Sequence, residues 1–185
     1  MNVTRTVVEE KPGNIAVMDV FSKLVQERII FIDSGIDSEL ANGVIAQMLY
    51  LDSLNHEPIS LYINSPGGSI YDGLAIYDVA NLLKSPINTV CVGMAASMAC
   101  ILMLIGKERS MTKHARLMLH QPSGGAIGNV KEIEITYNEI EKLKKELYSI
   151  VEEKSGIVNA EELFKWDVWY TAEEALEWGL ITKIL

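Results

Sequence analysis

Cysteine is scarce in this 185-residue sequence, and basic residues are outnumbered by acidic ones. The two cysteines, Cys91 and Cys100, lie in apolar stretches without Cys-x-x-Cys spacing, so neither a zinc site nor a disulfide framework is indicated. We expect both to be buried free thiols in a reducing compartment. With 16 Lys and Arg against 25 Asp and Glu, the net charge is −9, and the basic residues are scattered. This argues against a nucleic-acid or anionic-membrane partner, which needs clustered Lys and Arg.

The sequence also has no convincing membrane-spanning or secretory segment. Residues 85–106 carry no charge over about 22 positions, the length of a membrane helix. However, Pro86, Asn88, Gly93 and Ser97 interrupt this stretch. The N-terminus carries acidic residues where a signal peptide needs a basic start and an apolar run. We therefore expect a cytoplasmic protein without a membrane partner.

Alternating apolar segments predict the fold class. The composition, with 49% hydrophobic and 22% charged residues, is that of a globular protein, and no repeat or linker divides the chain into more than one domain. Helical and strand-like patterns alternate along the sequence. The predicted strands are 28–32, 59–63, 87–92 and 116–119, and the predicted helices are 38–53, 71–83 and 97–105. This order predicts an α/β fold with largely parallel strands.

The C-terminal third contains one unusually long helical pattern. Residues 121–128 are too rich in glycine for a helix, and a helix is predicted from 129 to 154, ended by Ser155-Gly156. At 1.5 Å per residue it would be roughly 35–40 Å long. Such a helix either projects toward a neighbouring subunit or lies across its own domain. A capping box at Thr171 and Glu174 then starts a short helix that Gly179 ends.

Histidine is rare enough to be considered one residue at a time. His56 and His114 lie in polar loops, where solvated side chains are expected. His120 instead ends an apolar strand, at the sheet edge where ligands bind in α/β folds. By position alone, it is either a site residue or a hydrogen-bonded structural histidine.

Two small-residue segments are candidates for chemistry. Ser97 follows Gly93-Met-Ala-Ala where a strand gives way to a helix, whose free amide hydrogens can stabilise an oxyanion. The surrounding residues do not form the Gly-x-Ser-x-Gly nucleophile motif, so a simple helix N-cap is the alternative. Gly67 and Gly68 could present backbone donors to a ligand or form only a tight turn. No nucleotide-binding motif is present.

Together, these segments resemble a known family. The resemblance rests on YINSPGGS at 62–69, GMAASM at 93–98, LHQP at 119–122 followed by Gly124-Gly125, and Asp167 ahead of AEEALEWGL at 172–180. In this order they closely resemble ClpP, the family of proteolytic subunits of the Clp protease. The resemblance runs from about Val20 to the last residue.

The resemblance implies a serine endopeptidase without metal or cofactor. Ser97 matches the nucleophile, His120 the general base and Asp167 the carboxylate that orients the histidine. The amides of Gly68 and Met98 match the oxyanion hole. The positions that match the family's substrate-binding edges, where a peptide adds as a β-strand, are Gly68, Ser69, Ile70, Ser123, Gly124 and Gly125.

The resemblance also implies an architecture. The family has a crotonase-like fold of repeated β-α units with a protruding handle helix, and two stacked heptameric rings. A separate AAA+ unfoldase of the ClpX, ClpA or ClpC type delivers unfolded polypeptides. By this comparison, residues 1–18 form a mobile segment at the axial pore and residues 19–185 a single protease domain.

Several positions depart from the family pattern. Lys165-Trp166 stands where Asp-Arg is common, and that arginine helps to couple the rings. Leu82 and Ser110 replace frequent aromatic residues of the ATPase docking groove, and Ser123 replaces a common leucine beside the substrate. One alternative is therefore a weakly active or non-catalytic paralogue in a mixed ring. Another is an acyl-CoA enzyme on the related crotonase scaffold, which also stabilises an oxyanion with two backbone amides.

Overall fold

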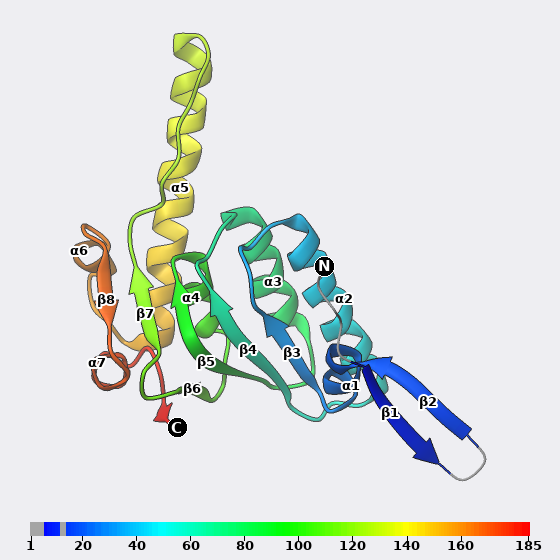
Figure 1. Ribbon diagram of the computed structural model, residues 1–185. Coiled ribbons are helices and arrows are strands. Elements are labelled where there is room, and N and C mark those ends of the chain that lie inside the picture. The colour runs from blue at the N-terminus through cyan, green and yellow to red at the C-terminus, as the bar shows by residue number, and fades with distance from the viewer. Residues whose placement is uncertain (1–5, 12–13) are drawn as a thin grey trace.

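A seven-stranded sheet organises the chain in this computed structural model, which describes residues 6–11 and 14–185 (Figure 1). Parallel pairing joins, in order, β3 (Ile29–Ile32), β4 (Ile59–Ser65), β5 (Ile87–Ala96), β6 (Arg109–Met111) and β9 (Lys183–Ile184). Off this path, β7 (Arg116–Leu119) pairs parallel with β5, and β8 (Val168–Tyr170) pairs antiparallel with β7. The predicted α/β fold with largely parallel strands is confirmed.

Three helices pack the core against this sheet: α2 (Ser38–Leu54), α3 (Ile70–Leu82) and α4 (Met98–Met103) (Figure 1). Of the predicted apolar face of α2, Val44, Met48 and Leu51 are buried, while Leu40 is only half-buried. Alternate strand residues such as Leu61 and Ile63 are fully buried. The period-two alternation of β4 therefore directs one face of the strand into the core.

The strand β5 is longer than predicted and carries the residues that lead to the site. Its first part, Thr89–Cys91, pairs with β6, whereas Met94–Ala96 pair with β7. Gly93 between them has φ +81°, and the Asn64 side chain accepts a hydrogen bond from Met94 N at 3.2 Å. The predicted end at Val92 was wrong because this glycine changes the direction of the strand without ending it.

The long helix α5 (Val130–Ser155) projects from the body (Figure 1). Asn129 and Glu132 form a capping box at its start, and Gly156 ends it with φ +78°. Its buried residues all lie in the second half: Leu143, Leu147, Tyr148 and Val151. Val130 and Tyr137 in the first half are exposed. Of the two alternatives for this helix, projection is the one observed.

The remaining elements were not among the predicted ones, except for the capped helix α7 (Ala172–Glu177). The N-terminal hairpin pairs β1 (Thr6–Lys11) with β2 (Asn14–Asp19) and points away from the body (Figure 1). The helix α1 (Val20–Gln26) follows the hairpin, and α6 (Ala160–Leu163) follows α5. Of the segment 1–18, positions 1–5 and 12–13 lie outside the described residues, and its mobility stays a prediction. None of the described helices is long and apolar enough to cross a membrane.

Candidate active site

Ser97 lies at the corner between β5 and α4. Its backbone has φ +56° and ψ −125°, a conformation that L-residues other than glycine seldom adopt. The Ser97 N–H donates to the carbonyl of Met118 in β7 at 2.9 Å. The Ser97 side chain makes no capping hydrogen bond, although the residue occupies the N-cap position of α4. The hydroxyl lies instead 2.7 Å from Nε2 of His120.

The pairing of β7 with β8 brings His120 and Asp167 together. In the antiparallel register Leu117 faces Tyr170 and Leu119 faces Val168, so one further step places His120 opposite Asp167. His120 Nδ1 and Asp167 Oδ1 are 3.7 Å apart. This distance is longer than a hydrogen bond. The side chain of His120 is 24% exposed and that of Asp167 73%.

The glycine loop before α3 lies against the corner at Ser97. A Cβ added to Gly67 would lie 2.7 Å from Ser97 Cβ and 3.0 Å from Met98 N, so only glycine fits there. Gly68 forms a parallel β-bridge with Ile36. The two hydrogen bonds of this bridge run from Ile36 N to Gly67 O and from Ser69 N to Ile36 O, so the N–H of Gly68 takes no part in it. The Met98 N–H, in the first turn of α4, has no acceptor within the helix. Both predicted oxyanion donors therefore lie near Ser97.

The predicted substrate-binding positions lie on two segments beside this corner. Ser69 caps α3 and Ile70 is the first residue of that helix. Ser123, Gly124 and Gly125 lie in the irregular segment after β7, where a Cβ on Gly124 would be 3.5 Å from the side chain of Ile140 in α5. Strand addition by a substrate at these positions stays a prediction.

A small cavity of about 20 Å³ opens beside the serine and the histidine. Apart from these two residues its lining is apolar. It is formed by Ile70, Met98, Ile101, Pro122, Leu147 and Phe164. Ile101, Leu147 and Phe164 were not predicted as site residues, because they come from three different helical segments and share no local motif.

Neither cysteine is a candidate nucleophile. Cys100 lies in α4 and is fully buried, and its burial strongly raises the pKa of the thiol. Burial also raises the pKa of Cys91 to about 12. A protonated thiol is a poor nucleophile, so both side chains are inert at neutral pH. The prediction that both are buried free thiols is confirmed.

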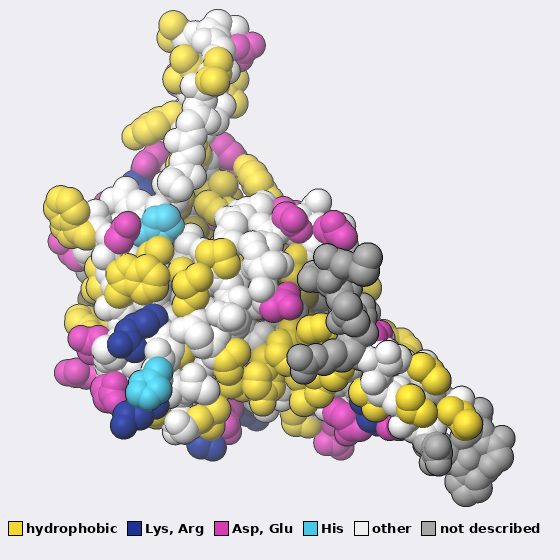
Figure 2. Space-filling model, viewed as in Figure 1, with side chains coloured by type: hydrophobic (Ala, Val, Ile, Leu, Met, Phe, Trp, Pro, Cys, Tyr) yellow, Lys and Arg dark blue, Asp and Glu magenta, His cyan; other side chains and the backbone are white. Residues whose placement is uncertain are grey.

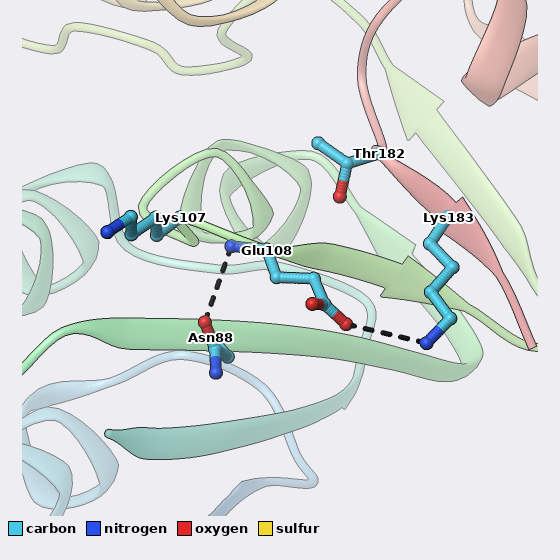
Figure 3. A pocket seen from close by; sticks show the side chains of 5 residues that line it. All are labelled: Asn88, Lys107, Glu108, Thr182 and Lys183. Carbon is cyan, nitrogen blue, oxygen red and sulfur yellow. Dashed lines mark hydrogen bonds and ion pairs between the residues drawn. The ribbon is translucent and has the colours of Figure 1, made fainter. Parts of the chain in front are cut away.

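A larger hollow of about 500 Å³ lies at the opposite end of β5 from Ser97 (Figure 3). Figure 3 shows Glu108 in this hollow between Asn88 and Lys183, with a Glu108–Lys183 ion pair of 3.8 Å. The residues that line it, which also include Lys107 and Thr182, contain no activated nucleophile. Within residues 6–11 and 14–185, no group of three or more His, Cys, Asp or Glu is arranged to hold a metal ion.

Comparisons with known proteins assign the chain to a family. The family model described as Clp protease matches residues 12–185. The chain belongs to the Clp protease family. A Bacteroides fragilis protein named ATP-dependent Clp protease proteolytic subunit is 48% identical, over 97% of this chain and 89% of the relative. A protein of the same name from Porphyromonas gingivalis is 46% identical, over 99% of this chain and 85% of the relative. Subunit 1 from Salinibacter ruber is 43% identical, over 97% and 79%.

Membership of the Clp protease family confirms the resemblance drawn from the sequence. It makes the chain a serine-type peptidase subunit. Neither the non-catalytic paralogue nor the acyl-CoA enzyme finds support in these relatives.

Proposed function

We propose that this chain is the serine endopeptidase subunit of a Clp protease, with Ser97 as nucleophile, His120 as general base and Asp167 as the orienting carboxylate. The observation that carries the proposal is the 2.7 Å contact between Ser97 Oγ and His120 Nε2 at a strained strand-to-helix corner. A non-catalytic subunit has no need of this arrangement.

The reaction follows from the positions of these atoms. His120 Nε2 takes the proton of Ser97 as Oγ attacks the carbonyl carbon of the peptide bond. The amides of Gly68 and Met98 donate hydrogen bonds to the oxyanion, and His120 then gives the proton to the leaving amine. Water attacks the acyl-enzyme with the same histidine as base. Asp167 stabilises the imidazolium and holds the N–H at Nδ1.

The triad can be tested with a fluorophosphonate probe and a fluorogenic peptide. We expect the probe to modify Ser97, as identified by peptide mapping, because only an activated serine reacts with it. The Ser97→Ala variant should lose the label and roughly six orders of magnitude of kcat, as for other serine peptidases that lose the nucleophile. Equal turnover by both proteins would reject the triad.

We further propose that the chain works in an assembly of two stacked heptameric rings in the cytoplasm, fed with unfolded polypeptides by an AAA+ unfoldase. The relatives are named ATP-dependent, whereas this sequence contains no nucleotide-binding motif of its own. ATP hydrolysis would therefore belong to a separate partner. The projecting α5, with exposed Val130 and Tyr137, supports contacts with other copies.

A further inference from the structure

The apolar cavity beside Ser97 is small, with a volume of about 20 Å³. We propose that Phe164 closes this cavity and restricts the subunit to substrates with a small, alanine-sized side chain on the acyl side of the cleaved bond. The inference deepens the proposed function and rests on it, since the cavity gains this role only if Ser97 is the nucleophile.

The position of the cavity identifies the substrate group that enters it. Ser97 and His120 are part of its lining, and Met98, whose amide is an oxyanion donor, forms another wall. When Oγ attacks the carbonyl carbon, the side chain of the residue that carries this carbonyl lies next to the serine. This side chain, at the P1 position, is therefore the one that reaches the cavity.

The size of the cavity limits that side chain. Its volume is about 20 Å³, and a cavity needs about 10–15 Å³ to hold one water molecule. The space thus corresponds to one methyl-sized group. A leucine or phenylalanine side chain would need the wall to move, and the apolar wall offers no partner to a charged one.

Three of the other wall residues are held in place by their packing. Met98 cannot swing back, because its side chain occupies the place left by Gly73, where an added Cβ would lie within 3.0 Å of three of its atoms. Ile101 and Leu147 belong to the hydrophobic core and are 1% and 5% exposed. Phe164 belongs to neither the sheet nor a long helix and caps the four-residue helix α6.

Phe164 fills the space that a longer side chain would need. Its ring is 2% exposed and packs against the ring of Tyr148 in α5, with centroids 4.7 Å apart. Tyr148 supports it from behind, so the ring cannot retreat. Replacing Phe164 by a smaller residue would extend the cavity toward Tyr148 without touching the triad or the oxyanion donors.

The test compares peptides that differ only at P1, with Ala, Leu or Phe there, on the assembled protein. We expect the wild type to cleave the Ala peptide at least about tenfold better in kcat/KM than the Leu peptide, since one methylene in an apolar pocket changes kcat/KM by about 10- to 200-fold. In Phe164→Ala and Phe164→Leu, this ratio should fall at least tenfold or reverse. The ratio of two peptides does not depend on the folded fraction of a variant.

The matched control is Leu163→Ala, which disturbs the same short helix at a residue outside the cavity lining. It should leave the P1 ratio unchanged. A wild type that cleaves the Leu or Phe peptide as well as the Ala peptide would overturn the inference, and so would Phe164 variants with the wild-type ratio. Fluorophosphonate labelling of Ser97 separates the two proposals: labelled, active protein with the wrong P1 preference contradicts only the pocket. Absence of both label and hydrolysis would reject the proposed function, and the inference would fall with it.

Discussion

Ser97 combines a strained backbone with a free hydroxyl. A serine at φ +56° costs on the order of 1–3 kcal/mol, and the surrounding contacts must offset it. The hydrogen bond from Ser97 N to Met118 and the close approach of Gly67 hold the residue in this conformation. Because a hydroxyl used as a helix cap could not also face His120, the strained conformation leaves the hydroxyl of the proposed nucleophile free for this contact.

Asp167 should matter for turnover and little for stability. Its carboxylate is 73% exposed and 3.7 Å from His120 Nδ1, so its proposed role is to orient the histidine and it adds little buried surface. We expect Asp167→Asn to lower kcat by roughly 10⁴-fold and to leave the thermal midpoint within about 1 °C, as exposed substitutions usually do. Steady-state kinetics and a thermal melt measure both. The exposed Asp78→Asn in α3 is the control and should change neither. A large drop in the melting midpoint of the Asp167 variant would instead assign it a structural role.

At the scale of elements, the two capping boxes provide a matched pair. Asn129 caps the projecting start of α5, and Thr171 caps α7, whose Ala172 and Ala175 are fully buried. Loss of a cap costs about 1 kcal/mol in either case. We expect Asn129→Ala to speed amide hydrogen exchange only within residues 130–137. Thr171→Ala should speed exchange within α7 and, beyond that helix, around Leu180 and Ile181, whose amides donate to the Ala175 carbonyl. Equal exchange patterns in the two variants would contradict this distinction.

The helices and strands that can be predicted from the sequence are those whose own residues show a long apolar periodicity. The α2, α3 and α5 helices were predicted within one or two residues, because their apolar spacing and end signals extend over three or more turns. The strands β6, β8 and β9 span two or three residues, too few for a period to show, and they form because their partners lie alongside. Asp167 precedes one of these strands, so its position beside His120 followed from the family resemblance and not from the pattern.

The residues that line the cavity beside Ser97 could not be predicted from local sequence patterns either. Its walls come from α3, α4, α5 and the end of α6, and no motif joins Ile101, Leu147 and Phe164 in the sequence. Ser97 and His120 could be proposed from their places at the ends of strands. The identity of the apolar residues around them depends on how the helices pack, which only the three-dimensional structure shows.

At the scale of the whole molecule, charge opposes assembly and apolar surface favours it. Each chain carries a formal charge of −9, so copies in one of the proposed rings would repel one another at low salt. Figure 2 shows hydrophobic side chains at the tip of the projecting helix and along the hairpin. The exposed residues there include Ile127, Val130 and Tyr137 on the helix side and Val8, Ile15 and Val17 on the hairpin. Exposed apolar patches of this kind mark contact surfaces.

The first half of α5 has two faces that allow a direct test of this role. Ile133 and Tyr137 lie on one face, four residues apart, and are 43% and 60% exposed, whereas Ile135 lies on the opposite face and is 59% exposed. We expect the double substitution Ile133→Glu and Tyr137→Glu to separate the proposed double ring into single rings, because buried unpaired carboxylates add to the existing repulsion. Mass photometry should then record half the particle mass.

The control for this test is Ile135→Glu, which adds an acidic residue to the same segment of α5 without changing the other face. It should keep the wild-type particle mass. If higher salt restores the double ring in the double variant, charge repulsion accounts for the separation. At about 1 M salt, exposed charges more than about 3 Å apart are largely screened from one another. A double variant with the wild-type mass, or a control that separates equally, would show that this face of α5 does not join the rings.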